Sequence, residues 1–333
     1  MTNSLTRPIR FGVLGAAKIA PKALIGPLAK LDGVEITRVA ARDRSRAEAY
    51  AVEHGIAGTA VDYQELVESD DVDVVYNPLP MSLHAEWTIA ALKAGKDVLC
   101  EKPFAANADE AGEMVKVASA EGRKLGEAFH HLYHPLFAHL RDQLASGCIG
   151  DLRRVESVFN VPVDRSDFRW DYAAAGGALM DLGCYPVSSI RRIVGQEPTV
   201  VSATAVEGPK GIDASLQAEL AFESGVTAHL STSMEAEFET RLSIEGTQGR
   251  IVVTNPFAPQ HGNTIMIETK HGVSQGPFDA GTTYEHMVRA FVDHVVHDTP
   301  FSTSGQDSIN NMAAIDAIYV AAGLPIRGLD LNT

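Results

Sequence analysis

The stretch IRFGVLGAAKIA (Ile9–Ala20) joins a buried strand to the start of a helix through a short turn that contains Gly15. Backbone amides at such a strand–turn–helix junction can hold the pyrophosphate of a dinucleotide. The usual three-glycine fingerprint is degenerate here, because Ala17 and Ala20 occupy the second and third glycine places. A turn with one glycine is weak evidence by itself, so the rest of the chain decides how it is interpreted.

The region around this turn alternates between short apolar strands and helices, which predicts parallel βαβ units in a doubly wound sheet. Strands are expected at 9–15, 35–42, 72–80, 97–103 and 123–129, and helices at 19–31, 45–55, 62–69, 82–95 and 107–122. Asp62 is a predicted N-cap and Gly55 a predicted C-cap. Asn107 with Glu110 resembles a capping box.

The pattern changes after residue 126, where several apolar–polar alternating strands follow one helix. Alternation of this kind predicts a mostly antiparallel sheet with one buried face. Strands are expected within 152–161, 197–208, 215–234, 240–255 and 264–272, and helices at 134–151, 284–297 and 307–323. We therefore predict an α/β chain with two domains, a dinucleotide-binding domain at 1–126 and an α+β domain with a large open sheet at 127–333.

Composition excludes several classes of partner. The chain has 333 residues and a formal net charge of −15, which argues against nucleic acid or an anionic membrane as the main partner. It has no apolar stretch of membrane-spanning length and no secretory signal, so we expect a cytoplasmic protein. Three scattered cysteines, Cys100, Cys148 and Cys184, indicate neither a disulfide framework nor a zinc site.

The end of the second predicted strand, AARDRSR (residues 40–46), indicates which dinucleotide would bind. An NAD site offers a carboxylate to the ribose 2′-hydroxyl, whereas an NADP site needs cations for the 2′-phosphate. The stretch contains Arg42, Arg44 and Arg46 beside Asp43, and Lys18 on the first turn adds a further cation. Cations at a helix start oppose the helix dipole, so their presence favours NADP, with NAD possible.

A lysine and a tyrosine are the candidate catalytic groups. Lys102 ends an apolar strand just before Pro103, on the side of the sheet where ligands bind. In the stretch WDYAAAGGALMDLGCYPVSSIRRIVG (170–195), Asp181 and Tyr185 are four residues apart and are predicted to share a helical face. A tyrosine with an ordinary pKa of ~10 accepts a hydroxyl proton near neutrality only if a cation stabilises its phenolate. Lys102 would supply that cation, and Asp181 would orient the substrate hydroxyl.

Three longer stretches resemble the Gfo/Idh/MocA oxidoreductases: AARDRSRAEAYA (40–51), VVYNPLPMSLHAEWTIAALKAGKDVLCEKP (74–103) and FRWDYAAAGGALMDLGCYPVSSIRRIVG (168–195). The resemblance is strongest to the branch with dimeric dihydrodiol dehydrogenase, D-xylose dehydrogenase and glucose–fructose oxidoreductase. It implies a Rossmann domain joined to an open-sheet domain, and catalysis by Lys102, Tyr185 and Asp181.

The same resemblance implies two sets of binding residues. Substrate is expected at Lys102, His131, Asp181 and Tyr185. The cofactor is expected to contact Gly15, Ala17, Lys18, Ile19, Arg42, Asp43, Arg46, Pro78, Leu79, His84, Glu101, Lys102, Arg169 and Trp170. The stretch FHHLYHP (129–135) departs from the family pattern F-M-Y-R-x-H-P, which leaves the substrate open. His130, His131 and His134 lack a flanking ligand set, so no metal is expected.

These observations predict an enzyme that transfers a hydride between NADP(H) and a hydroxyl or carbonyl carbon of a sugar, polyol or cyclic diol. The alternative is a dinucleotide-sensing regulator with the same fold and no turnover. A homodimer or higher homo-oligomer through the second domain's sheet is also expected, because its strands carry an apolar face that few helices can cover.

Overall fold

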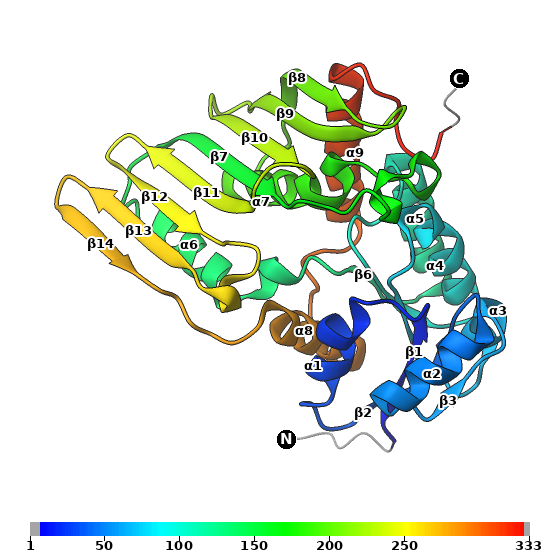
Figure 1. Cartoon of the computed structure of the whole chain (residues 1–333). Helices are drawn as coiled ribbons and strands as arrows, with labels where there is room; N and C mark the ends of the chain where they lie inside the picture. The colour runs from blue at the N-terminus through cyan, green and yellow to red at the C-terminus, as the bar shows by residue number, and fades with distance from the viewer. Residues whose placement is uncertain (1–6, 330–333) are drawn as a thin grey trace. The chain divides into compact units, whose positions relative to one another are not determined.

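The computed structural model describes residues 7–329, which divide by packing into two compact units (Figure 1). The first contains residues up to Ala105, Asp109–Phe129 and Tyr284–Ile309. The second contains Ala106–Ala108, His130–Thr283 and the residues from Asn310 onward.

The first unit is built on a six-stranded sheet with the strand order β3-β2-β1-β4-β5-β6, in which every described pair is parallel. This is the strand order of dinucleotide-binding folds. The prediction of a doubly wound parallel sheet is confirmed, and Figure 1 shows helices on both sides of it. The strands are β1 (Ile9–Leu14), β2 (Val34–Ala40), β3 (Gly58–Thr59), β4 (Val74–Asn77), β5 (Asp97–Cys100) and β6 (Leu125–Glu127).

The helices of the first unit begin and end largely at the predicted caps. Asp62 accepts a hydrogen bond from the Glu65 amide at 2.8 Å, and Gly55 has the left-handed φ of 67° that favours glycine at a C-cap. The helices are α2 (Arg44–His54), α3 (Tyr63–Glu68), α4 (His84–Lys93), α5 (Ala108–Glu121) and α8 (Thr283–His297). Short turns of helix lie at η1 (Pro21–Ile25), α1 (Gly26–Leu28) and η2 (Met81–Leu83).

The first helix differs from its prediction. A regular helix over 19–31 is wrong: the structure has a π-helical turn, η1, followed by the short α1. Pro21 and Pro27 lack amide donors, and the Gly26 amide bonds to the Pro21 carbonyl five residues back.

Residues 284–309 pack with the first unit, whereas the sequence analysis placed all of 127–333 in the second domain. A Cβ at Gly126 on β6 would lie 2.5 Å from Phe301 and 3.1 Å from Phe291. The Glu127 amide also donates to the Thr303 carbonyl at 2.8 Å. A glycine in β6 thus lets two aromatic rings from α8 and the segment after it approach the sheet closely.

The second unit carries an eight-stranded sheet with the order β14-β13-β12-β11-β7-β10-β9-β8. β7 and β10 pair in parallel, and the other described neighbours are antiparallel, which confirms the mostly antiparallel sheet. The strands are β7 (Leu152–Asn160), β8 (Thr199–Glu207), β9 (Asp213–Ala221), β10 (Thr227–Ser233), β11 (Glu239–Gly246), β12 (Gly249–Thr254), β13 (Thr264–Thr269) and β14 (Gly272–Gly276).

Helices of the second unit cover one face of this sheet. The helix α7 (Cys184–Val194) packs on β7 and β10. The π-helical turn η6 (Leu179–Gly183) leads directly into it. The remaining helices are η3 (His130–Tyr133), α6 (Pro135–Ala145), η4 (Phe168–Trp170), η5 (Tyr172–Ala174), η7 (Pro259–His261) and α9 (Gln306–Ala321), the last from Asn310 onward.

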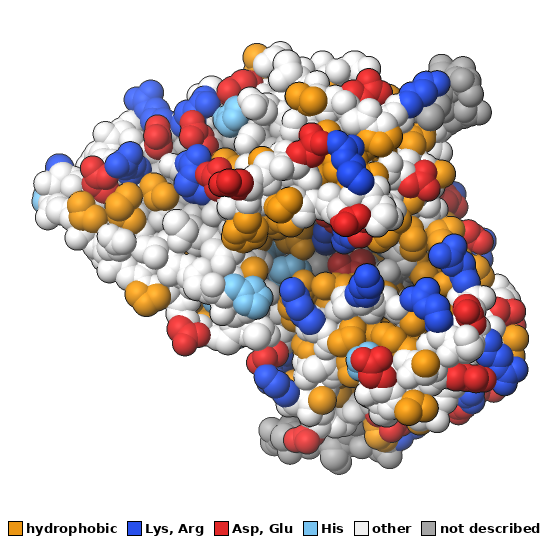
Figure 2. Space-filling model, in the orientation of Figure 1, with side chains coloured by type: hydrophobic (Ala, Val, Ile, Leu, Met, Phe, Trp, Pro, Cys, Tyr) orange, Lys and Arg blue, Asp and Glu red, His pale blue; other side chains and the backbone are white. Residues whose placement is uncertain are grey.

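The two faces of the eight-stranded sheet differ in polarity. Val155, Leu230 and Leu242 on one face are buried. The opposite face is a ladder of part-exposed charges, in which Arg154 pairs with Glu156 and Glu219 at 2.9 and 3.5 Å. Figure 2 shows positive and negative side chains alternating over these strands. The argument for an uncovered apolar face is therefore wrong, because the apolar side chains face inward and the outward face is polar.

Candidate active site

The turn after β1 has the geometry of a phosphate-binding turn. Gly15 has a φ of 78°, and its amide donates to the Ala40 carbonyl at 2.7 Å. A Cβ at this position would lie 3.0 Å from Leu79 Cδ2, so a larger residue would be both strained and crowded. The carbonyl oxygens of the next two residues accept hydrogen bonds from Arg46 and Tyr50 on α2. The turn is thus anchored to α2, and it leaves Lys18 exposed and Ile19 half-buried.

The expected ribose-binding residues lie at the start of α2. Arg42, Asp43 and Arg46 are all exposed. The Asp43 carboxylate caps the helix by accepting from the Ser45 amide at 2.9 Å and the Ser45 hydroxyl at 2.7 Å. These Ser45 hydrogen bonds lower the pKa of Asp43. The carboxylate therefore has a structural partner, while the cations beside it are exposed to a ligand.

The strand end that bears Lys102 is fixed by buried hydrogen bonds. Glu101 accepts from the Tyr76 hydroxyl at 2.7 Å and from the Lys102 amide at 3.2 Å. Burial and the Glu101 charge raise the pKa of Tyr76 well above its ordinary value, so this tyrosine stays a donor. The peptide bond from Lys102 to Pro103 is cis. The Lys102 side chain is half-exposed, whereas Glu101 and Pro103 are buried.

His84 joins the loops that follow β4 and β5. Its Nε2 lies 2.8 Å from the Leu79 carbonyl oxygen and its Nδ1 lies 2.9 Å from that of Pro103. Burial lowers the pKa of His84 to about 4. The residue was expected at the cofactor, and the structure places its buried ring beneath the loops of Pro78, Leu79 and Lys102. His84 therefore connects the two loops through hydrogen bonds to their backbone carbonyl groups.

In the second unit, a buried ion pair anchors the segment that leads into α7. Arg327 donates to Asp213 at 2.7 Å and to the Gly176 carbonyl at 2.7 Å, and both charged side chains are fully buried. Asp213 also accepts from the Leu179 amide at 2.7 Å. A Cβ at Gly177 would lie 2.2 Å from an Asp213 oxygen, which explains why two glycines precede the helix.

Asp181 lies on η6, where its carboxylate pairs with Arg169 at 2.8 Å. The Asp181 charge raises the pKa of Arg169, which also pairs with Asp167 at 3.0 Å. The prediction of one regular helix through Asp181 and Tyr185 is corrected by the π-helical turn between them. Trp170, expected at the cofactor, lies in an apolar cluster with Leu182 and donates to the Val163 carbonyl at 3.2 Å.

Tyr185 on α7 is held in a buried aromatic setting. Its hydroxyl lies 2.9 Å from His130 Nε2, and its ring packs against Phe159 and Phe257 at centroid distances of 5.2 and 5.3 Å. The other His130 nitrogen, Nδ1, lies 2.8 Å from the Thr283 hydroxyl oxygen. The structure therefore gives Tyr185 a histidine partner that the sequence analysis did not assign to the site.

The adjacent histidine, which was expected to contact substrate, lies beside the same tyrosine, with ring centroids 5.0 Å apart. His131 is fully buried, with Nε2 3.2 Å from the Ser189 hydroxyl oxygen and its ring packed on Phe137 and Phe257. The structure shows this segment as the 3-10 turn η3, which follows the predicted strand at 123–129. The signal for His130 was the departure from the family pattern in FHHLYHP, whose three histidines, His130, His131 and His134, the sequence alone could not rank.

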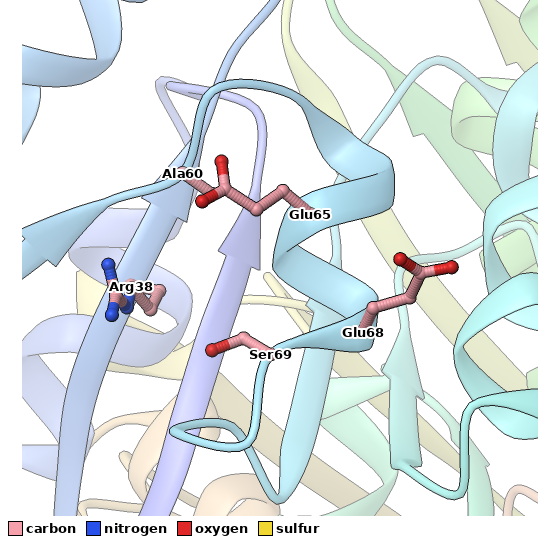
Figure 3. A pocket seen from close by; sticks show the side chains of 5 residues that line it. All are labelled: Arg38, Ala60, Glu65, Glu68 and Ser69. Carbon is pink, nitrogen blue, oxygen red and sulfur yellow. The ribbon is translucent and has the colours of Figure 1, made fainter.

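Two kinds of feature are absent from the described residues 7–329. No group of three or more His, Cys, Asp or Glu side chains there is arranged to hold a metal ion. No helix there is long and apolar enough to cross a membrane. The pocket in Figure 3 lies beside β3, where Arg38 bonds to Thr59 and Asp71, and none of the predicted site residues lines it.

Comparisons with known proteins agree with this geometry. Residues 9–129 match the family described as an oxidoreductase family with an NAD-binding Rossmann fold, and residues 137–252 match the GFO/IDH/MocA C-terminal domain. The chain is 34% identical to a D-xylose 1-dehydrogenase (NADP(+)) of Haloferax volcanii, over 94% of this chain and 97% of that protein.

Two further relatives are named as reductases, the first of them for a dTDP-linked sugar. A dTDP-3,4-didehydro-2,6-dideoxy-alpha-D-glucose 3-reductase of Saccharopolyspora spinosa is 33% identical over 94% of this chain and 97% of its own length. A 3-ketoreductase from Actinomadura kijaniata, solved with NADP and TDP-benzene, is 31% identical with a TM-score of 0.89, covering 95% of this chain and 98% of that one. Both domains of this family match the chain, and the matched residues include the turn after β1, Lys102 at the end of β5 and Tyr185 on α7. The chain therefore belongs to the Gfo/Idh/MocA family of NAD(P)-binding oxidoreductases.

Proposed function

We propose that this oxidoreductase uses NADP(H) to oxidise a hydroxyl carbon, or reduce the corresponding carbonyl, of a sugar or sugar derivative. The observation that carries the proposal is the buried Tyr185 hydroxyl, held 2.9 Å from His130 in a chain that also has a nucleotide-binding turn. A phenol in this position can exchange a proton with a substrate oxygen. The relatives named above act on xylose or on deoxyhexose derivatives, which supports the sugar class.

The residues divide the chemistry between them. NADP(H), when bound, supplies or accepts the hydride at its nicotinamide ring. Tyr185 takes the hydroxyl proton during oxidation and returns it during reduction, and Lys102 supplies the positive charge that favours the phenolate. Asp181 accepts a hydrogen bond from a substrate hydroxyl, and its 2.8 Å ion pair with Arg169 keeps both groups charged and fixed in direction.

NADP is the preferred dinucleotide in this proposal. A Cβ at Gly15 would crowd the turn, so the backbone there can approach a pyrophosphate closely. Exposed Lys18, Arg42 and Arg46 provide charge for a 2′-phosphate, while one oxygen of the Asp43 carboxylate, Oδ1, caps α2. Two of the relatives described above are named with NADP, which agrees with this assignment.

Turnover separates the enzyme from a dinucleotide-sensing regulator. The purified protein is incubated with NADP⁺ or NAD⁺ and a panel of aldoses, deoxyhexoses, inositols and diols, and reduced nicotinamide is followed by absorbance. The reverse assay uses NADPH with keto-sugars. We expect NADP(H)-dependent turnover with at least one sugar-class compound, and a loss of about 100-fold or more in a Tyr185→Phe variant that still binds NADPH. Binding without turnover in either direction would favour the regulator.

We also propose that two copies associate through the polar face of the eight-stranded sheet. The ladder around Arg154, Glu156 and Glu219 offers charges of both signs, so the face can pair with a second copy by complementary charge. Its part-exposed side chains span several strands, which suits an interface of ordinary size.

A further inference from the structure

We propose that His130 is a proton-relay residue behind Tyr185, and that it sets the direction of the tyrosine hydroxyl and exchanges its proton. This inference rests on the proposed function, because it gives the Tyr185 proton a destination within the protein. This chain has His130 where the family pattern described in the sequence analysis has methionine.

Both His130 nitrogens have hydroxyl partners, which is compatible with the tautomer that the relay requires. His130 Nδ1 and the Thr283 hydroxyl oxygen lie 2.8 Å apart, and the His130 Nε2 and Tyr185 oxygen lie 2.9 Å apart. A neutral imidazole has one donor and one acceptor. With the proton on Nδ1 donated to Thr283, the Nε2 lone pair accepts the Tyr185 hydroxyl proton.

The proton balance follows from this arrangement. During oxidation the substrate hydroxyl proton passes to the Tyr185 phenolate as the hydride leaves for the bound dinucleotide. The regenerated phenol then gives a proton to Nε2 of neutral His130, which becomes imidazolium, and Tyr185 returns to phenolate. The imidazolium holds this proton until the product has left and solvent re-enters the site. Reduction runs the same transfers backwards, and no further oxidant or reductant is required.

The surroundings keep this relay short. Tyr185 and His130 are about one-twentieth exposed, and Phe159 and Phe257 pack against the tyrosine ring. The His131 ring lies beside both, with centroids 6.0 Å from His130 and 5.0 Å from Tyr185. Because these rings restrict water around the phenol, a fixed imidazole provides a hydrogen-bonded route for its proton.

The test compares variants that keep or remove the proton acceptor. His130→Gln retains side-chain donor and acceptor groups but cannot take up a proton, and His130→Ala leaves a cavity that added imidazole can fill. We expect both to lower kcat by about 10- to 100-fold, the effect of losing a hydrogen bond to a charged group. KM should stay within about threefold, because the substrate contacts are untouched. Imidazole should restore turnover to His130→Ala in a concentration-dependent way and should not restore it to His130→Gln.

Two variants serve as controls. His134→Asn changes a nearby buried histidine whose Nδ1 caps α6 at Leu136, and asparagine keeps a cap there, so kcat should not change. Thr283→Val removes the partner that selects the His130 tautomer, and it should lower kcat about 2- to 10-fold, the effect of losing one neutral hydrogen bond.

Each outcome decides between the proposals. Normal kcat in His130→Gln, or failure of imidazole to rescue a folded His130→Ala protein, would overturn the relay while leaving Tyr185 as the acid–base group. If His130→Ala does not fold, His130→Gln and Thr283→Val decide the question. An active Tyr185→Phe enzyme would instead overturn the proposed function and the relay with it.

Discussion

At the scale of single residues, each candidate catalytic group is oriented by a hydrogen-bond or ion-pair partner. Lys102 follows a glutamate that is itself hydrogen-bonded to Tyr76, so the backbone from which the lysine projects is held in place. The Tyr185 hydroxyl is hydrogen-bonded to His130, and the Asp181 carboxylate forms an ion pair with Arg169. These pairings hold each side chain, or the backbone that carries it, in one orientation.

If Lys102 and Tyr185 act together, removing either should abolish most activity without disturbing the fold. Lys102→Met and Tyr185→Phe are each expected to lower kcat by about 10²- to 10⁴-fold, the usual contribution of acid–base catalysis. The double variant should lose little more, because groups that act as a unit are not additive. Lys116→Met, which removes an exposed lysine paired with Glu113, is the control. A Lys102→Met enzyme within about threefold of wild type would refute the lysine's role.

We expect the exposed cations beside the first turn to set the dinucleotide preference. Arg42→Gln and Arg46→Gln should each raise the Kd of NADPH by about tenfold or more, because each loses a charge-assisted hydrogen bond to the 2′-phosphate. The Kd of NADH should change little. Calorimetric titration of both dinucleotides measures this, with exposed Arg123→Gln as the control. Equal or tighter binding of NADH by the wild type would make Asp43 the ribose ligand.

At the scale of secondary-structure elements, buried polar groups fix the two segments that carry the chemistry. His84, the first residue of α4, joins the loops after β4 and β5. The pair of Asp213 and Arg327 joins β9 and the C-terminal segment to the residues that begin η6. Both act on backbone groups, so neither leaves a hydrophobic pattern in the sequence.

The buried pair should dominate the stability of the second unit. Arg327→Met leaves the Asp213 charge buried without its partner, which is expected to cost about 3–5 kcal/mol of unfolding free energy. A double variant with Asp213→Leu should recover only part of this loss, because the Leu179 amide and the Tyr319 hydroxyl lose their acceptor. Urea unfolding measures both. Arg165→Met, which breaks an exposed pair with Glu235, should cost less than about 1 kcal/mol, and an equal cost for both variants would contradict the argument.

His84 should make stability depend on pH. Burial lowers its pKa in the folded state to about 4, compared with about 6.5 in the unfolded chain. The unfolded state therefore binds the proton first as pH falls, so the stability contributed by neutral His84 is complete above pH ~6.5 and is lost toward pH ~4.

Comparison with a variant isolates this contribution from other titrating groups. The difference in unfolding free energy between wild type and His84→Gln should be largest above pH ~6.5 and should shrink as pH falls, measured by urea unfolding at several pH values. A difference that is the same at pH 7.5 and pH 5 would show that His84 does not carry the effect.

At the scale of the whole molecule, we propose that copies associate through the polar face of the eight-stranded sheet. Sedimentation at micromolar concentration should show at least a dimer, because the ladder presents both signs of charge over several strands. Raising the salt concentration should weaken the dimer, since part-exposed ion pairs are screened. Replacing Arg154 and Arg250 by Glu should weaken it further, as like charges would then oppose. A monomer at all protein concentrations would overturn this proposal.

The sequence by itself determined the parallel sheet, the mostly antiparallel sheet, the caps at Asp62 and Gly55, and the family. These depend on local periodicity and on short motifs, whose physical causes lie within a few residues of each other. The candidate residues Lys102, Asp181 and Tyr185 came from the same motifs, and their roles stay predictions.

Only the tertiary structure decided the partners. His130 comes to Tyr185 from 55 residues away, and Arg327 comes to Asp213 from 114 residues away. It also decided that His131 is buried, that the helix before Tyr185 begins with a π turn, and that the outward sheet face is polar. Each of these depends on which distant backbone or side-chain group satisfies a buried polar atom, and hydrophobic periodicity along the chain carries no information about that choice.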